Sequence, residues 1–255
     1  MSHTVRIAAV GDLHYGRGDA GKASALFADV HERADVLLLC GDLTDYGTEE
    51  EALVLARDLA DVRIPILAVL GNHDHESGRP DLIERILRDH GIRLLDGENV
   101  VVCGVGFAGT KGFGGGFGNR MLDPWGERII KDFVQESVDE MLKLEKALAR
   151  LHTPSRIAVL HYAPVVDTVQ GEPPEIWPFL GSSRLGEVLD AYEATAAFHG
   201  HVHHGQPLGS TRTGVPVYNV AYPVLKRHFQ GQPPLRVIEV EGRSQETQDA
   251  AEHSA

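Results

Sequence analysis

Short apolar runs alternate with amphipathic stretches through the first third of the chain. The apolar runs, which predict strands, are 5–10, 36–40 and 64–70. The stretches with apolar residues at helical spacing, which predict helices, are 23–33, 49–60 and 81–90. Thr48 precedes three glutamates and is a typical N-cap, and Gly91 is a typical helix stop. This alternation predicts βαβ units and a parallel sheet with buried strands.

The remaining two thirds are less regular. Further strands are predicted at 100–105, 156–160, 196–198, 215–220 and 235–240. A long helix, either continuous or broken once, is predicted at 125–150, and a shorter one at 183–194. Six glycines in 107–120 and three prolines in 171–178 predict loops. No linker divides the chain, so we expect one domain over 1–241 and a polar, frayed tail over 242–255.

Composition narrows the class of protein. With 255 residues, 42% of them hydrophobic and 24% charged, the chain suits an ordinary globular protein. The net charge of −13 argues against binding to nucleic acid or to an anionic membrane, and no apolar run reaches the roughly 20 residues of a membrane span. Cys40 and Cys103 both sit in apolar runs and are expected to be buried, reduced thiols. Without a signal-peptide pattern at the N-terminus, a cytoplasmic location is expected.

Residues of metal-ligand type follow five of the predicted strands. In chain order they are Asp12 and His14, Asp42, Asn72 and His73, His161, and His201 and His203. The carboxyl ends of parallel strands share one edge of a sheet, so these side chains should converge there. Three oxygen donors and four imidazoles, leaving His73 aside, are too many for one tetrahedral ion. They suit two ions that share a carboxylate, and imidazole with carboxylate favours Mn²⁺, Fe, Co²⁺, Ni²⁺ or Zn²⁺ over Mg²⁺ and Ca²⁺.

These motifs carry a family resemblance. Asp-Leu-His at 12–14, Gly-Asp at 41–42, Gly-Asn-His-Asp at 71–74, His161 and Gly-His-Val-His at 200–203 resemble, in order, the five motifs of the calcineurin-like metallophosphoesterases. The resemblance implies a four-layer α/β/β/α sandwich of two facing mixed β-sheets flanked by helices. It also implies a ligand set for each ion. The first ion would take Asp12, His14, Asp42 and His203, and the second Asp42, Asn72, His161 and His201, so that Asp42 bridges.

The resemblance also implies a reaction. Two ions would lower the pKa of a bridging water, and the resulting hydroxide would attack phosphorus. His73 would assist the leaving group, and Asp45 matches a position that pairs with this histidine in some members. The Gly-Asn-His-Asp form resembles the cyclic-nucleotide phosphodiesterase branch, whereas Tyr46 and Gly47 depart from the protein-phosphatase motif. A small phosphorylated substrate, either a phosphodiester or a phosphomonoester, is therefore expected.

Three other functions remain open. Some family members keep the fold as a non-catalytic scaffold that binds proteins, but such sequences lose ligands or the histidine of Gly-Asn-His, and both are present here. A metal-binding regulatory protein without turnover is the second alternative. A nuclease of the family is the third, and it is disfavoured because the chain leaves little length or positive charge for a DNA-binding extension.

The glycine-rich stretch around 109–118 has two interpretations. It lacks the P-loop pattern, so it is either a flexible surface loop or a lid that offers Lys111 or Arg120 to a substrate phosphate. Asp74 is expected to anchor its turn instead of binding metal. The predicted helix at 125–150 carries alternating charges and is either exposed along one face or part of a dimer surface. The sequence leaves the oligomeric state undecided.

Overall fold

The computed structural model describes residues 2–243, and its first sheet contains the N-terminal apolar runs as parallel neighbours. This sheet has the strand order β11-β1-β2-β3-β4. Its members are β1 (Ser2–Val10), β2 (Val36–Cys40), β3 (Ile66–Val69), β4 (Arg93–Leu94) and β11 (Arg236–Arg243). Every residue of β2 is buried, which is why its sequence is apolar without alternation. Only β11 runs antiparallel, along the edge of β1.

The second sheet has a parallel centre and antiparallel edges. Its order is β5-β6-β7-β8-β10-β9, in which β6, β7, β8 and β10 are parallel. The strands are β5 (Glu98–Val102), β6 (Val105–Gly109), β7 (Arg156–Val159), β8 (Ala196–His199), β9 (Leu208–Ser210) and β10 (Pro216–Asn219). The edge strands β5 and β9 pair antiparallel with β6 and β10. Both sheets are therefore mixed, as the resemblance implied.

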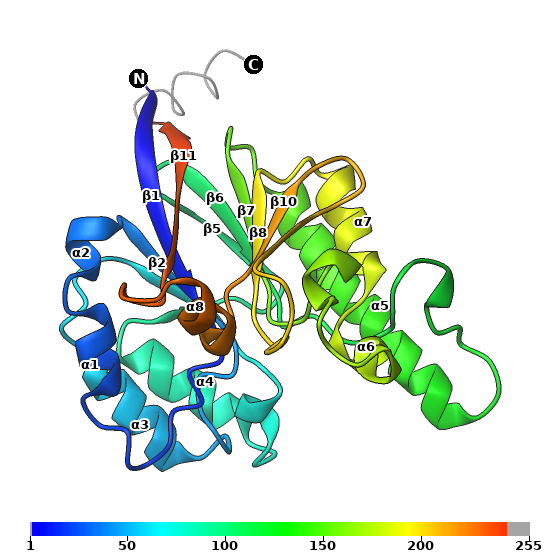
Figure 1. Cartoon of the computed structure of the whole chain (residues 1–255), viewed down its shortest axis with the longest axis horizontal. Coiled ribbons are helices and arrows are strands. Elements are labelled where there is room, and N and C mark those ends of the chain that lie inside the picture. Colours follow the sequence, from blue (N-terminus) through cyan, green and yellow to red (C-terminus); the bar gives the residue numbers. More distant parts are fainter. Residues whose placement is uncertain (1, 244–255) are drawn as a thin grey trace.

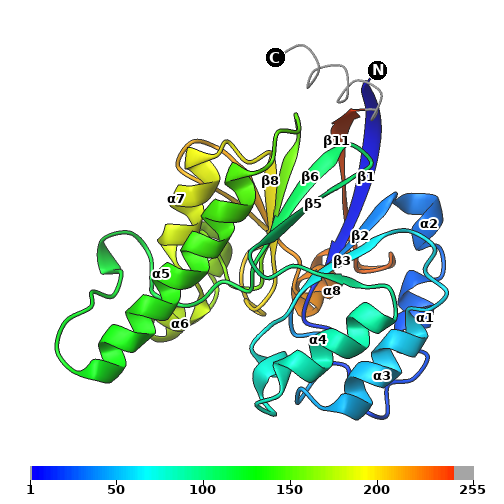
Figure 2. The same ribbon diagram turned by 180° about the vertical axis from the view of Figure 1, so that it is seen from behind.

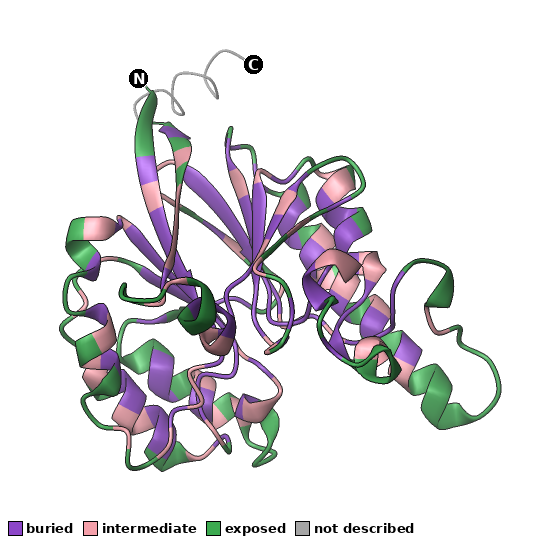
Figure 3. Ribbon diagram, viewed as in Figure 1, coloured by how far each residue is buried: buried purple, intermediate pink, exposed green. Residues whose placement is uncertain are grey.

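Helices cover the outer face of each sheet (Figures 1 and 2). The helices beside the first sheet are α1 (Lys22–Phe27), α2 (Val30–Arg33), α3 (Glu49–Asp58) and α4 (Pro80–Asp89). Those beside the second are α5 (Arg128–Ala149), α6 (Trp177–Leu180) and α7 (Ser183–Ala191), while α8 (Tyr222–His228) follows β10. Short 3₁₀ turns are η1 (His73–His75), η2 (Gly118–Arg120), η3 (Val166–Val169) and η4 (Pro174–Ile176). The predicted α/β/β/α sandwich is confirmed, and Figure 3 shows its buried residues concentrated along the strands.

The predicted strand at 100–105 contains the end of β5, a two-residue hairpin turn and the first residue of β6. Val102 pairs with Val105, and the two residues between them, Cys103 and Gly104, have φ of 51° and 72°. Left-handed backbone at both central positions is the geometry of a tight type I′ turn. Cys103 is consequently exposed, so the prediction that its thiol is buried is wrong, whereas Cys40 is buried as predicted. The predicted loop at 107–120 begins inside β6, which ends at Gly109.

Other boundaries also differ from the prediction. The helix expected at 23–33 is divided into α1 and α2, and the stretch at 125–150 is one unbroken helix that begins at Arg128. The proline-rich stretch at 171–178 contains η4 and the start of α6, because proline is tolerated in the first turn of a helix. Of the expected frayed tail, Gly242 and Arg243 belong to β11, and 244–255 lie outside the described residues. No helix within 2–243 is long and apolar enough to cross a bilayer.

Candidate metal centre

The predicted ligands meet where strands of both sheets end. Asp12, Asp42 and Asn72 follow β1, β2 and β3 of the first sheet, and His161 and His201 follow β7 and β8 of the second. Each lies just beyond the carboxyl end of its strand, and Figure 1 shows β1 running from the N-terminus at the top down to this end of the sheet. This is the edge at which open parallel sheets bind their ligands.

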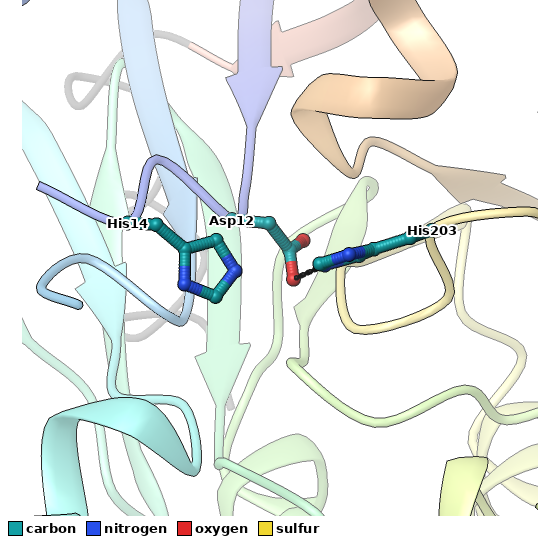
Figure 4. A group of neighbouring side chains, drawn as sticks. All are labelled: Asp12, His14 and His203. Carbon is teal, nitrogen blue, oxygen red and sulfur yellow. Dashed lines mark hydrogen bonds and ion pairs between the residues drawn. The ribbon is translucent and has the colours of Figure 1, made fainter. Parts of the chain in front are cut away.

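The first group of side chains consists of Asp12, His14 and His203 (Figure 4). Each offers one ligand atom, and these atoms lie within 4.8 Å of one another. His203 Nε2 is 2.9 Å from Asp12 Oδ1. His14 Nε2 lies 3.8 Å from Asp42 Oδ2 and is a buried nitrogen with no hydrogen-bond partner among the described residues. A buried, unpartnered imidazole nitrogen that faces carboxylates fits a bound cation.

The second group consists of Asp42, His161 and His201. His161 Nε2 lies 3.3 Å from Asp42 Oδ1 and 3.0 Å from the amide oxygen of Asn72. On the other side of the ring, His161 Nδ1 donates to the carbonyl of Cys40 at 3.0 Å, which leaves the Nε2 lone pair free to face the site. The Asp42 carboxylate therefore lies beside a histidine of each group, as a bridging ligand must.

Burial sets the protonation of these groups. It lowers the pKa of His14 and His161 and brings that of His201 down to about 3, so these imidazoles are neutral and able to ligate. Burial also raises the pKa of Asp12 to about 6, although the hydrogen bond from His203 opposes this shift.

The surroundings of the Asp12 and Asp42 carboxylates show whether the site suits a bound cation. Asp12 and Asp42 are each 2% exposed, and within residues 2–243 their ion-pair partners are histidines only. Two buried carboxylates without a lysine or arginine are costly unless a cation compensates them. The donor set of imidazole, carboxylate and amide oxygen therefore fits divalent ions.

The backbone around the ligands is strained. Asp12, His14, Asp42 and His201 have φ of 57°, 44°, 47° and 66°, the left-handed region that costs a residue with a side chain on the order of 1–3 kcal/mol. Two neighbouring glycines make room for the carboxylates. A Cβ on Gly71 would lie 2.2 Å from Asp42 Oδ1, and one on Gly200 would lie 2.3 Å from Asp12 Oδ2. The protein therefore tolerates strained backbone at these four residues because that conformation directs their side chains into the site.

Asp74 anchors two of the ligand loops, the role expected for it. Its buried carboxylate accepts hydrogen bonds from the main-chain nitrogens of Leu43, Thr44 and Gly71 at 3.1, 2.8 and 2.8 Å. The Thr44 hydroxyl donates a fourth bond at 2.7 Å. One side chain thus ties the loop that carries Asp42 to the loop that carries Asn72.

His73 lies beside the metal ligands. Its main-chain nitrogen donates to Asp42 Oδ1 at 2.8 Å, and its ring packs edge-on against the ring of His14 with centroids 4.5 Å apart. The ring Nδ1 donates to the main-chain carbonyl of Asp45 at 2.7 Å. Asp45 is thus the neighbour of His73 that the resemblance implied, but the contact is made by its carbonyl. The Asp45 carboxylate instead lies 3.6 Å from His14 Nδ1.

The glycine-rich loop is held against the body of the protein. The main-chain nitrogens of Gly115 and Gly116 donate to the carbonyls of Pro178 and Gly181, and that of Gly112 donates to the buried carboxylate of Glu140. Most of the residues from 112 to 117 are buried. The glycine-rich loop is therefore hydrogen-bonded to the segment that contains Pro178 and Gly181, a contact that the sequence did not predict.

The two basic side chains of this loop differ in position. Lys111 lies over the rings of Phe113 and Tyr162, 4.9 and 5.3 Å from their centroids, and its burial lowers the pKa of the ammonium group. Arg120 is exposed in η2. Tyr162, which the sequence analysis did not single out, packs on His201 with ring centroids 4.3 Å apart. Its position directly after His161 was the available signal.

Comparison with known proteins identifies a family. The model of the family described as calcineurin-like phosphoesterase matches residues 5–205. A probable glycerophosphodiester phosphodiesterase GpdQ of Arcobacter nitrofigilis is 26% identical over 210 residues, which cover 76% of this chain and 67% of that protein. A probable cyclic nucleotide phosphodiesterase of Moraxella catarrhalis is 40% identical over 86 residues, or 30% of this chain and 31% of that protein. The chain thus spans about two thirds of the first relative, and the match to the second covers under a third of its length.

Solved structures show the same fold. The phosphopantetheinyl hydrolase PptH of Mycobacterium tuberculosis superposes with a TM-score of 0.65 at 17% identity, over 91% of this chain and 95% of that one. The purple acid phosphatase PPD1 of yellow lupin superposes with a TM-score of 0.51 at 14% identity, over 88% of this chain and 44% of that one. At such identities the likeness extends to the fold alone.

Proposed function

Because the chain belongs to the calcineurin-like phosphoesterase family, we propose that it hydrolyses a small phosphodiester with the help of two divalent metal ions. The observation that carries this proposal is the position of the Asp42 carboxylate beside both histidine groups, with the unpartnered Nε2 of His14 facing it. The names of the two curated relatives, both phosphodiesterases, favour a diester over a monoester.

The ligand residues would hold the ions in two sets that share Asp42. The first set is Asp12, His14, Asp42 and His203, and the second is Asp42, Asn72, His161 and His201. Bound ions would supply positive charge against the phosphate oxygens and a water of lowered pKa as the nucleophile. The nitrogen and oxygen donors suit Mn²⁺, Fe, Co²⁺, Ni²⁺ or Zn²⁺.

The chain's own contribution to bond cleavage is assigned to His73. The Asp45 carbonyl accepts from His73 Nδ1, which fixes the ring and leaves Nε2 as the nitrogen that can give up a proton. A protonated His73 would donate from Nε2 to the departing alkoxide and remain bound to Asp45 as a neutral ring. The edge-on contact with His14 limits rotation of the ring.

The test is hydrolysis by the metal-loaded protein. After removal of metal with a chelator and reloading with Mn²⁺, we expect cleavage of bis-p-nitrophenyl phosphate to exceed cleavage of p-nitrophenyl phosphate. Asp42→Asn should abolish the activity. Asp61→Asn, which removes one negative charge from the exposed turn after α3, should not change it. Absence of hydrolysis of both esters with each of the candidate metals would refute the proposal.

A further inference from the structure

Asp45 contacts two different histidines through two different groups. Its main-chain carbonyl accepts from His73 Nδ1, and its carboxylate lies 3.6 Å from His14 Nδ1. We propose that the Asp45 carboxylate is a positioning residue for the metal ligand His14, and that only its main chain serves His73. This inference rests on the proposed function, because it assigns a role within the same metal centre.

The orientation of the His14 ring supports this assignment. Its Nε2 lies 3.8 Å from the Asp42 carboxylate and has no hydrogen-bond partner within residues 2–243, so this is the nitrogen that faces the ion site. An imidazole that ligates through Nε2 carries its proton on Nδ1, and such an N–H is normally held by an acceptor. The Asp45 carboxylate lies 3.6 Å from Nδ1, beyond hydrogen-bond distance but within ion-pair range, and it is the acidic group that faces this nitrogen.

The backbone of Asp45 is fixed without help from its side chain. His14 and Tyr15 donate from their main-chain nitrogens to the carbonyls of Asp42 and Leu43, each at 3.0 Å. In return, the main-chain nitrogen of Asp45 donates to the Tyr15 carbonyl at 3.2 Å. The loops that carry the two ligands therefore form a short parallel ladder. A substitution at Asp45 removes the carboxylate but leaves the carbonyl in place for His73.

The variant Asp45→Asn distinguishes a carboxylate that positions His14 from one that serves His73. An asparagine keeps the size of the side chain and the carbonyl bond to His73, but it offers His14 a neutral acceptor in place of a charged one. Loss of such an outer partner typically weakens metal affinity by about 10–100-fold. We therefore expect weakened binding of the ion held by His14, and little change for the ion held by His161 and His201.

The experiment is calorimetric titration of Mn²⁺ into the metal-free full chain. Wild type is compared with Asp45→Asn and with the matched control Asp61→Asn, which makes the same change of charge on the exposed turn after α3. We expect one of two sites to weaken at least about tenfold in Asp45→Asn only. Unchanged affinity at both sites would overturn the inference. Failure of wild type to bind Mn²⁺ would instead refute the proposed function.

A kinetic comparison provides the second readout. If Asp45 acts through His14, excess Mn²⁺ should restore the activity of Asp45→Asn equally for esters with good and poor leaving groups. If its carboxylate served His73, the loss would persist at saturating metal and would be larger for the poor leaving group, as expected for His73→Ala. That second pattern would overturn the inference even with altered metal affinity.

Discussion

Removal of the Asp74 carboxylate should destabilise the protein and loosen the metal centre together. In Asp74→Ala, three buried main-chain N–H groups, those of Leu43, Thr44 and Gly71, lose their acceptor, and the Thr44 hydroxyl loses its partner. Each buried donor left without a partner costs roughly 1–3 kcal/mol. Because water can enter part of the space, we expect a loss of about 4 kcal/mol in the free energy of unfolding.

Two further variants distinguish the loss of the whole Asp74 carboxylate from the loss of a single hydrogen bond to it. Thr44→Val removes one of the four donors and leaves the main-chain bonds, so it should cost only about 1 kcal/mol. Asp74→Asn keeps the size of the side chain but turns an amide N–H₂ toward a main-chain N–H, so it should cost nearly as much as Asp74→Ala.

Urea unfolding of the metal-free protein, followed by circular dichroism, measures these differences as shifts in midpoint at constant slope. For a chain of this size, about 4 kcal/mol also corresponds to a fall in Tm of roughly 8–16 °C. Mn²⁺ affinity should fall in the same order as stability, because the anchored loops carry Asp42 and Asn72. A loss below about 1 kcal/mol in Asp74→Ala would refute the reasoning, since it would mean that the buried donors find other partners.

Further predictions concern the metal ions, the proton donor His73, the buried His199 and the basic residues of the glycine-rich loop. Asp42→Asn should lower the Mn²⁺ content toward zero by elemental analysis, and a variant that keeps both ions would contradict the bridging assignment. His73→Ala should keep its metal but lose more kcat with an alkyl ester than with a nitrophenyl ester, and equal losses would indicate charge stabilisation in place of proton donation. Burial lowers the pKa of His199 from 6.5 to about 4, so the contribution of His199 to stability should fall by up to about 3 kcal/mol as the pH drops from 6.5 toward 4, while the raised pKa of Asp12 and Asp74 acts in the opposite direction. The difference in stability between wild type and His199→Gln, measured by urea titration at several pH values, should therefore shift in favour of the variant as the pH falls. Lys111→Ala should raise KM at constant metal content while Arg120→Ala leaves it unchanged, and unaltered kinetics in both would exclude a substrate contact.

The sequence predicted best the elements whose pattern is local. The strands β2 and β3 and the buried end of β1 are apolar runs followed by glycine and a polar residue, and this pattern indicated both their position and the convergence of their ends. The capping box at Thr48 and Glu51 likewise begins α3 where it was expected. Such features depend on residues a few positions apart, which the sequence displays directly.

Features set by long-range contacts could not be predicted in this way. The turn at Cys103 and Gly104 occurs because the flanking valines pair across a hairpin, and a continuous apolar run conceals that turn. The glycine-rich loop is ordered by bonds to Pro178 and Gly181, which are more than sixty residues away in the chain. The use of the Asp45 carbonyl toward His73, with the carboxylate toward His14, likewise depends on the ladder between two loops. A motif places a residue near its partner but does not say which of its atoms makes the contact.

The pairing of β1 with β11 has a consequence for how the protein is made. Residues 2–9 hydrogen-bond along their outer edge with residues 236–243, so two segments from opposite ends of the sequence share one ladder. During synthesis, β1 can pair with β2 early, but its other edge stays unpaired until residues 236–243 have left the ribosome. Such non-local pairing slows folding, and an open edge strand is a template for intermolecular association. The outer edge of β1 therefore stays unpaired until β11 has been synthesised, and closure of the first sheet is a late step of folding.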